Sequence, residues 1–184
     1  MPAADEQQLI IEAKSGSHEA FRCLVERYMK QAYTIAYGFV NDHHDAEEIA
    51  QDAFVRVYES LSSFRGDAAF STWLYRIVTN LSLNRVTQIK RRREEHLDGK
   101  HEDMIHESAL DGSQDIDVAG HIERALHELP TLQRAVVMLR HMNGLSTREV
   151  SQILHCSEGT VKTHLFRGLE KMRQKLEFLR AEGI

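Results

Sequence analysis

The chain has 184 residues, of which 42% are hydrophobic and 28% are charged, and its formal net charge is −5. This balance is that of an ordinary globular protein and excludes a wholly disordered chain. The longest apolar runs, such as residues 135–139, are too short to span a bilayer, and residues 1–6 lack the basic flank and apolar stretch of a signal peptide. Two isolated cysteines, Cys23 and Cys156, fit a reducing compartment and provide no disulfide framework. We therefore expect a cytoplasmic protein without direct membrane insertion.

The charges are strongly segregated along the chain. Residues 94–123 contain ten acidic side chains and one lysine, whereas residues 125–184 carry nine basic and six acidic side chains. The acidic stretch contains glycines and lacks a sustained apolar period, which is typical of a solvated linker. Because the chain has only two prolines and is rich in helix formers, we predict an all-α fold. The predicted organisation is a helical domain at residues 1–93, an acidic flexible linker at 94–118 and a second small helical domain at 119–184.

Apolar residues recur at helical spacing through the first domain. The stripe from Leu9 to Tyr28 is broken at residues 15–17, so a short helix is expected to lead into a longer one. A further stripe runs from Ala46 to Leu61. The opposite face of that helix is acidic and carries Asp45, Glu48, Asp52 and Glu59. Since no histidine or nucleophile accompanies these carboxylates, they predict no active site; a protein-docking face and a merely solvated face both remain open.

The next helix is predicted over residues 71–93, after a turn at residues 62–67, and its last turns are wholly basic. Aromatic and basic residues are interleaved here, a combination that holds single-stranded nucleic acid by stacking and by contacts to its backbone. The interleaved residues include Phe64, Arg65, Phe70, Trp73, Tyr75, Arg76 and Arg85. Trp73 alone is more often a core residue than a stacking platform. Gly66 permits positive φ or a close backbone approach, and it also fits a plain connector.

The second domain opens with an apolar stripe that Pro130 stops, followed by a helix from Thr131 to about Met142. Residues 146–149 form a capping box that starts a third helix, and a short break at residues 155–157 precedes the last one. This pattern predicts a helix-turn-helix on two supporting helices. The last helix carries, away from its apolar stripe, groups that contact phosphates or read base edges: Thr160, Lys162, Thr163, His164, Arg167 and Lys171. The alternative is a solvated charged face in a four-helix domain.

Eleven histidines invite a metal-site hypothesis. His96, His101 and His106 recur every five residues, a spacing that spreads them around a helix axis instead of forming the usual i, i+4 ligand pair. Neither cysteine has a cysteine or histidine in ligand spacing, and the sequence contains no P-loop, dinucleotide fingerprint or nucleophile motif. We therefore predict no metal, no cofactor and no catalytic residue.

The chain also contains an ordered set of longer motifs. They are residues 45–58, Phe64-Arg65-Gly66-Asp67, residues 70–77, Leu129-Pro130, Gly144-Leu145-Ser146 and residues 159–164. This set strongly resembles bacterial extracytoplasmic-function (ECF) RNA polymerase sigma factors, over about residues 5–176. The resemblance implies sigma domain 2 at residues 1–93 and sigma domain 4 at 119–184. It implies a factor, not an enzyme, that binds core RNA polymerase, directs it to promoters by their −10 and −35 elements and assists DNA melting.

The same resemblance implies three binding surfaces and one regulator. Docking on the clamp coiled coil of the polymerase β′ subunit is implied for Asp45, Glu48, Gln51, Asp52 and Arg56. Contacts with the −10 element, including a loop for a flipped base, are implied for Phe64, Arg65, Gly66, Asp67, Phe70, Trp73, Arg76, Asn80, Asn84 and Arg85. Recognition of the −35 element is implied for Thr160, Lys162, Thr163, His164 and Arg167, where members often carry Arg in place of Lys162 and His164. Contact with the polymerase β subunit and control by an anti-sigma protein are implied as well.

Two other function classes deserve comparison with this one. A free-standing helix-turn-helix regulator would have no use for a polymerase-docking helix, and a metal-dependent enzyme would need a nucleophile–base constellation that the sequence lacks. With a flexible linker, the two DNA-reading domains are independently tethered. Because ordering them on DNA costs entropy, the free chain should bind promoters weakly.

Overall fold

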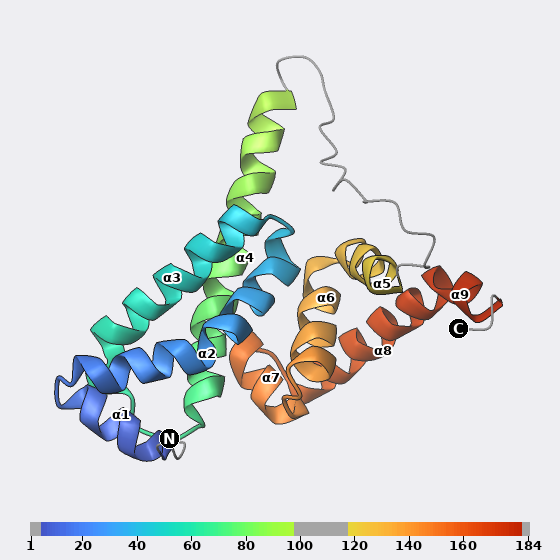
Figure 1. The fold of residues 1–184 in the computed structure, drawn as a ribbon. Helices are drawn as coiled ribbons and strands as arrows, with labels where there is room; N and C mark the ends of the chain where they lie inside the picture. Colours follow the sequence, from blue (N-terminus) through green and yellow to red (C-terminus); the bar gives the residue numbers. More distant parts are fainter. Residues whose placement is uncertain (1–4, 98–117, 182–184) are drawn as a thin grey trace.

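The computed structural model describes residues 5–97 and 118–181, and within these ranges the predicted all-α fold is confirmed (Figure 1). The first domain consists of α1 (Glu6–Lys14), α2 (His18–Val40), α3 (His43–Ser60), the 3₁₀ turn η1 (Leu61–Ser63) and α4 (Phe70–Leu97). The second consists of α5 (Val118–His127), α6 (Thr131–Val137), the π-helical turn η2 (Met138–Met142), α7 (Thr147–Leu154), α8 (Glu158–Lys175) and α9 (Glu177–Ala181). None of the helices in the described ranges is long and apolar enough to cross a bilayer.

Local side-chain caps set where several helices begin. The side chains of Ser17, Asp42 and Ser157 accept hydrogen bonds from backbone N–H groups in the first turns of α2, α3 and α8. At α7, Ser146 and Glu149 form the reciprocal capping box that the sequence predicts. Each cap satisfies backbone donors that have no partner inside the helix, so the start of each helix is fixed by its own sequence.

Two helices differ from the sequence-based prediction. α4 continues to Leu97, into the segment predicted as linker, because no glycine or proline interrupts residues 94–97. The helix expected over residues 131–142 widens at its end into η2, where the N–H of Asn143 bonds to the carbonyl of Met138 five residues earlier. Both differences lie at helix ends, where local signals are weakest.

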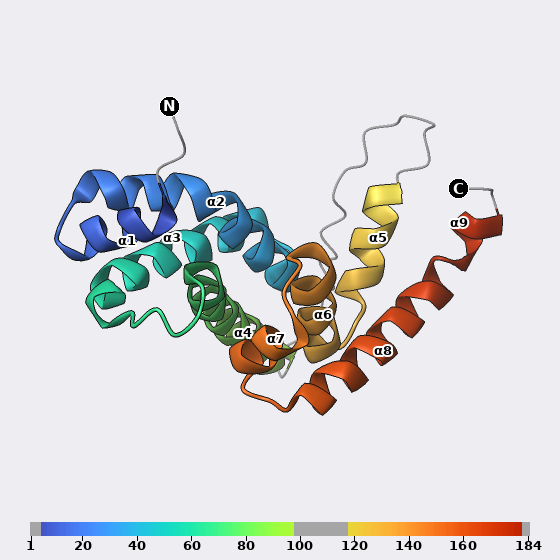
Figure 2. The ribbon, with the colours of Figure 1, turned by 90° about the horizontal axis from the view of Figure 1, so that it is seen from below.

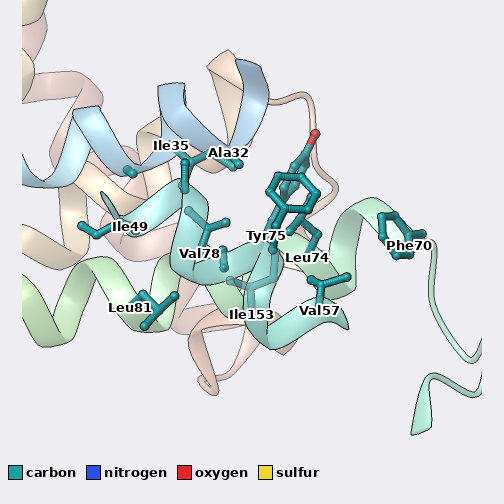
Figure 3. Close-up of a cluster of buried hydrophobic side chains, with 14 of the residues drawn as sticks. Ala32, Ile35, Ile49, Val57, Phe70, Leu74, Tyr75, Val78, Leu81 and Ile153 are labelled. Carbon is teal, nitrogen blue, oxygen red and sulfur yellow. The ribbon is translucent and has the colours of Figure 1, made fainter. Parts of the chain in front are cut away.

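The apolar stripes of α2, α3 and α4 pack against one another in the core of the first domain (Figure 3). The buried side chains of this cluster include Ala32 and Ile35 from α2, Ile49 and Val57 from α3, and Leu74, Val78 and Leu81 from α4. Ile153 of α7, from the second domain, is buried in the same cluster. The apolar faces of the two domains therefore merge into one continuous core.

The second domain packs directly on the first, which differs from the expectation of two independently tethered domains. α7 lies against α4, while α5 and α6 lie against α2 (Figures 1 and 2). Gly38 of α2 allows the close approach, because a Cβ atom at this position would overlap the Sδ and Cε atoms of Met138. In both views α8 lies on the far side of α6 from the first domain, which leaves the outer face of α8 open.

Candidate nucleic-acid and polymerase interfaces

The outer face of α3 presents the residues predicted to dock on polymerase. Gln51, Asp52 and Arg56 are exposed, whereas Asp45 and Glu48 are partly buried, with 21% and 45% of their side chains exposed. Beneath this face the apolar stripe of α3 packs into the domain core, which fixes the direction of the helix. The structure therefore gathers the five predicted residues on one helix, but in two different environments.

Asp45 and Glu48 are bridged by an arginine from the neighbouring helix. The Nη1 atom of Arg85 in α4 pairs with Oδ1 of Asp45, and its Nη2 atom lies 2.8 Å from Oε2 of Glu48. This hydrogen bond, and secondarily the charge of His44, hold the pKa of Glu48 below its ordinary value. The same bond to Glu48 raises the pKa of Arg85. Arg85, predicted as a −10 contact, is thus engaged inside the protein and links the two helices.

The turn between η1 and α4 places an aromatic cluster beside exposed polar residues. The Phe64 ring packs on Trp73, with ring centroids 5.0 Å apart, and both are partly exposed. Phe70 lies beneath them and is only 1% exposed, so its side chain packs in the core and is closed to a DNA base. The Nζ atom of Lys14 donates to the carbonyl of Phe64 over 2.8 Å, which anchors the turn to α1. Arg65, Gly66 and Asp67 are exposed beyond this anchor, and Gly66 has a φ of 80°.

Three of the predicted −10 contacts form an exposed stripe along α4. Arg76, Asn80 and Asn84 follow one another at intervals of four residues and all are exposed. At the start of the stripe, Nη2 of Arg76 lies 2.8 Å from Nε2 of His155, the C-cap residue that follows α7. The stripe is therefore open along most of its length and engaged by the second domain at one end.

The helix-turn-helix predicted in the second domain is formed by α7 and α8. On α8, Lys162, Thr163 and Arg167 are exposed on the open outer side. The hydroxyl of Thr160 lies 2.9 Å from that of its cap Ser157. His164 is partly buried. The exposed set combines two cations with one short hydroxyl, a combination that suits phosphate contacts and base edges in a major groove.

Residues that join the two domains were not identified by sequence reasoning. The hydroxyl of Thr72 donates to Oε1 of Glu149 over 3.1 Å, and Arg76 meets His155. These pairs are separated by 77 and 79 residues, respectively. No local spacing rule connects residues so far apart, although the unusual Gly38 inside a helix was a usable signal for a close approach.

Metal binding finds no support in the described ranges, where no group of three or more histidine, cysteine or acidic residues could hold an ion. His101, His106 and the side chain of His96 lie outside the described residues. The prediction for these three histidines therefore stays a prediction.

Comparisons with known proteins identify the family. The model of sigma-70 region 2 matches residues 24–93, and the model of sigma-70 region 4 matches residues 120–172. The chain is 33% identical to the ECF RNA polymerase sigma factor SigW of Bacillus subtilis, covering 92% of this chain and 96% of the relative. It is 31% identical to the RNA polymerase sigma-H factor of Pseudomonas aeruginosa, covering 97% of both chains.

Among solved structures, the sigma factor RpoE in complex with the anti-sigma factor NepR from Bartonella quintana has a similar fold, with a TM-score of 0.67 and 23% identity. The match covers 85% of this chain and 96% of that one. The two family models fall on the two helical domains described above, and the identity to SigW extends over nearly the whole chain. The chain therefore belongs to the ECF family of RNA polymerase sigma factors, which are transcription initiation factors that direct polymerase to promoters and are not enzymes.

Proposed function

We propose that this sigma factor divides promoter recognition among three surfaces on separate helices. The α3 surface docks on the clamp coiled coil of the polymerase β′ subunit, and the second domain contacts the β subunit. The turn at residues 64–69 and the exposed stripe of α4 bind the −10 element as it melts, and α8 reads the −35 element in the major groove. A base flipped from the duplex would stack near Phe64 and Trp73, where aromatic surface is partly exposed.

The observation that carries this proposal is the exposed polar face of α3 at Gln51, Asp52 and Arg56, beside the partly exposed carboxylates of Asp45 and Glu48. Gln51 and Asp52 are exposed at the centre of the α3 face, while the apolar side of the helix is buried. A charged surface on a rigid helix suits docking on a partner of opposite charge.

The test reverses one charge on this surface and one away from it. Asp52→Arg should abolish co-purification with core polymerase, because it places like charges against a basic docking surface. Glu47→Arg is the matched control: Glu47 is also exposed on α3 but lies about 140° around the helix from Asp52. Both variants should keep the thermal stability of the parent, since both sites are exposed. Undiminished polymerase binding by Asp52→Arg would remove docking from this surface.

We also propose that an anti-sigma protein controls the factor in the cytoplasm, where core polymerase works. The support is the fold shared with RpoE, which was solved in complex with the anti-sigma factor NepR. Purification of a tagged form from its native cells before and after stress tests this proposal. A partner that is retained before induction and lost after it is the expected result.

A further inference from the structure

Arg85 connects the two surfaces that the proposed function assigns to polymerase and to DNA. It projects from α4 and reaches two carboxylates on α3, Asp45 and Glu48, that stand three residues apart on one side of the helix. The planar guanidinium offers two donors at once and can bridge such a pair, which a lysine ammonium cannot match in geometry. One cation therefore pairs with two of the five residues predicted to dock on polymerase and leaves the cluster of three with a net charge of −1.

The same side chain lies beside the DNA-binding stripe. Arg85 directly follows Asn84, the last residue of the exposed stripe, and is turned from it by about 100° around the helix axis. It is also about 13.5 Å along α4 from Arg76, the position that the second domain engages. With a long flexible side chain, Arg85 can point toward α3 or toward a strand that follows the stripe.

The ion pairs around Arg85 are accessible to competitors. Arg85 keeps 28% of its side chain exposed, and Glu48 keeps 45%. Pairs in contact with water contribute little net stability, because water and salt compensate for much of the attraction. A partner that offers its own cations to Asp45 and Glu48 can therefore replace Arg85 without a large energetic penalty.

We propose that Arg85 exchanges the carboxylates of α3 for a DNA phosphate, and that this exchange couples polymerase docking to −10 DNA binding. In the free protein it pairs with Asp45 and Glu48 and is withheld from DNA. When basic groups of polymerase pair with these carboxylates, the guanidinium is released and binds a backbone phosphate near the −10 element. The inference rests on the proposed function, specifically on docking through α3. By thermodynamic linkage, DNA that captures Arg85 strengthens polymerase docking by the same factor.

The first experiment compares one substitution in two states of the protein. Arg85→Gln is measured for binding to a single-stranded −10 oligonucleotide, once as the free chain and once as the holoenzyme with core polymerase. The expected result is no change for the free chain and a loss of about three- to tenfold for the holoenzyme, where the phosphate contact exists. An equal effect in both states, or no effect in either, would overturn the proposal.

A conservative variant separates the phosphate contact from a structural role. Arg85→Lys keeps the positive charge but loses the fork that spans Asp45 and Glu48. If Arg85 acts on DNA by charge, the lysine holoenzyme should bind the oligonucleotide nearly as tightly as the parent. If the Arg85→Lys holoenzyme loses as much oligonucleotide affinity as the Arg85→Gln holoenzyme, the defect reflects damaged α3–α4 packing and the proposed exchange is wrong.

The second experiment needs no polymerase. Asp45→Asn combined with Glu48→Gln should release Arg85 in the free chain, raise its oligonucleotide affinity and steepen the salt dependence by about 0.7, the slope for one single-strand phosphate contact. The control, Glu47→Gln with Glu59→Gln, changes the net charge of α3 equally at two exposed sites outside the bridge. The gain must also vanish when Arg85→Gln is added. A gain equal to that of the control, or one that survives Arg85→Gln, contradicts the proposal.

These outcomes also separate this inference from the docking assignment on which it rests. If Asp52→Arg still binds polymerase, docking through α3 is wrong, whatever the DNA measurements show. If Asp52→Arg loses polymerase but Arg85→Gln acts equally in both states, docking stands and the exchange fails.

Discussion

Replacing Gly38 by alanine should separate the two domains without touching a predicted binding surface. The new Cβ atom would overlap the Sδ and Cε atoms of Met138, across the contact between α2 and the second domain. Met138 is only 1% exposed and is packed among apolar residues of its own domain. The overlapping atoms are the far end of a flexible side chain, so Met138 can shift in part, and the remaining strain falls on the contact between the two domains.

The size of this effect follows from the packing. Adding carbon atoms to a well-packed site destabilises it by about 1–3 kcal/mol, and because Met138 can shift in part, the lower figure of about 1 kcal/mol applies to alanine, which is roughly a fivefold shift toward separated domains. Alanine also favours the helix over glycine by up to about 1 kcal/mol. That gain is the same whether the two domains are packed together or apart, because α2 is intact in both states. It therefore leaves the equilibrium between packed and separated domains unchanged.

Small-angle X-ray scattering of the free chain measures the result directly. The radius of gyration of Gly38→Ala should exceed that of the parent, and Gly38→Leu should extend the trend. Gly159→Ala is the control, because its Cβ would meet only the Oγ atom of Ser157 at 3.6 Å, an ordinary contact. Identical scattering from parent, control and both Gly38 variants would show that this contact does not hold the domains together.

Two further predictions concern pH and the division between the DNA-reading surfaces. Burial, and then the charge of Arg134, lower the pKa of His127 to about 4, from an ordinary value of 6.5. The unfolded chain therefore binds a proton that the folded chain rejects, and the free energy of unfolding should fall as pH drops from 6.5 toward 4. His127→Gln should lessen the loss between pH 7 and pH 5 by about 1–2 kcal/mol in urea unfolding, and an unchanged pH dependence would contradict this. Arg167→Ala should weaken transcription from duplex and pre-opened promoters alike. Asn80→Ala should weaken transcription from the duplex promoter, and a pre-opened −10 bubble should partly restore it. If the two variants behave identically on both templates, the proposed division between the two DNA-reading surfaces is wrong.

Helix positions were predictable because each rests on local chemistry. The stripe from Ala46 to Leu61 has the period of a helix with one buried face, and the structure buries that face in α3. The capping box at Ser146 and Glu149 fixes the start of α7 in the same way. Such signals act over a few residues and survive in any tertiary setting, which is why they can be recognised without a structure.

The state of individual site residues was less predictable, because it depends on distant partners. Phe70 and Phe64 look alike in an aromatic turn, yet Phe70 is buried and Phe64 is partly exposed. Arg85 resembles any basic residue of a DNA-binding helix until the carboxylates of α3, 37 and 40 residues away, are placed beside it. Sequence spacing predicts which helix carries a residue, whereas tertiary packing decides whether its side chain is buried, paired or exposed.

The direct packing of the second domain on the first changes the reason why the free factor should bind promoters weakly. Independent tethering would leave every DNA contact available and limit affinity only by the entropy of ordering two domains. In the structure, Arg76 is engaged by His155 and Arg85 by Asp45 and Glu48, while Arg167 on α8 remains exposed. Two arginines of the −10 helix thus already hold partners within the chain, which leaves fewer of their N–H donors for a phosphate. The weak binding would then arise at the −10 surface and not at the −35 surface, and a longer or shorter linker would leave it largely unchanged.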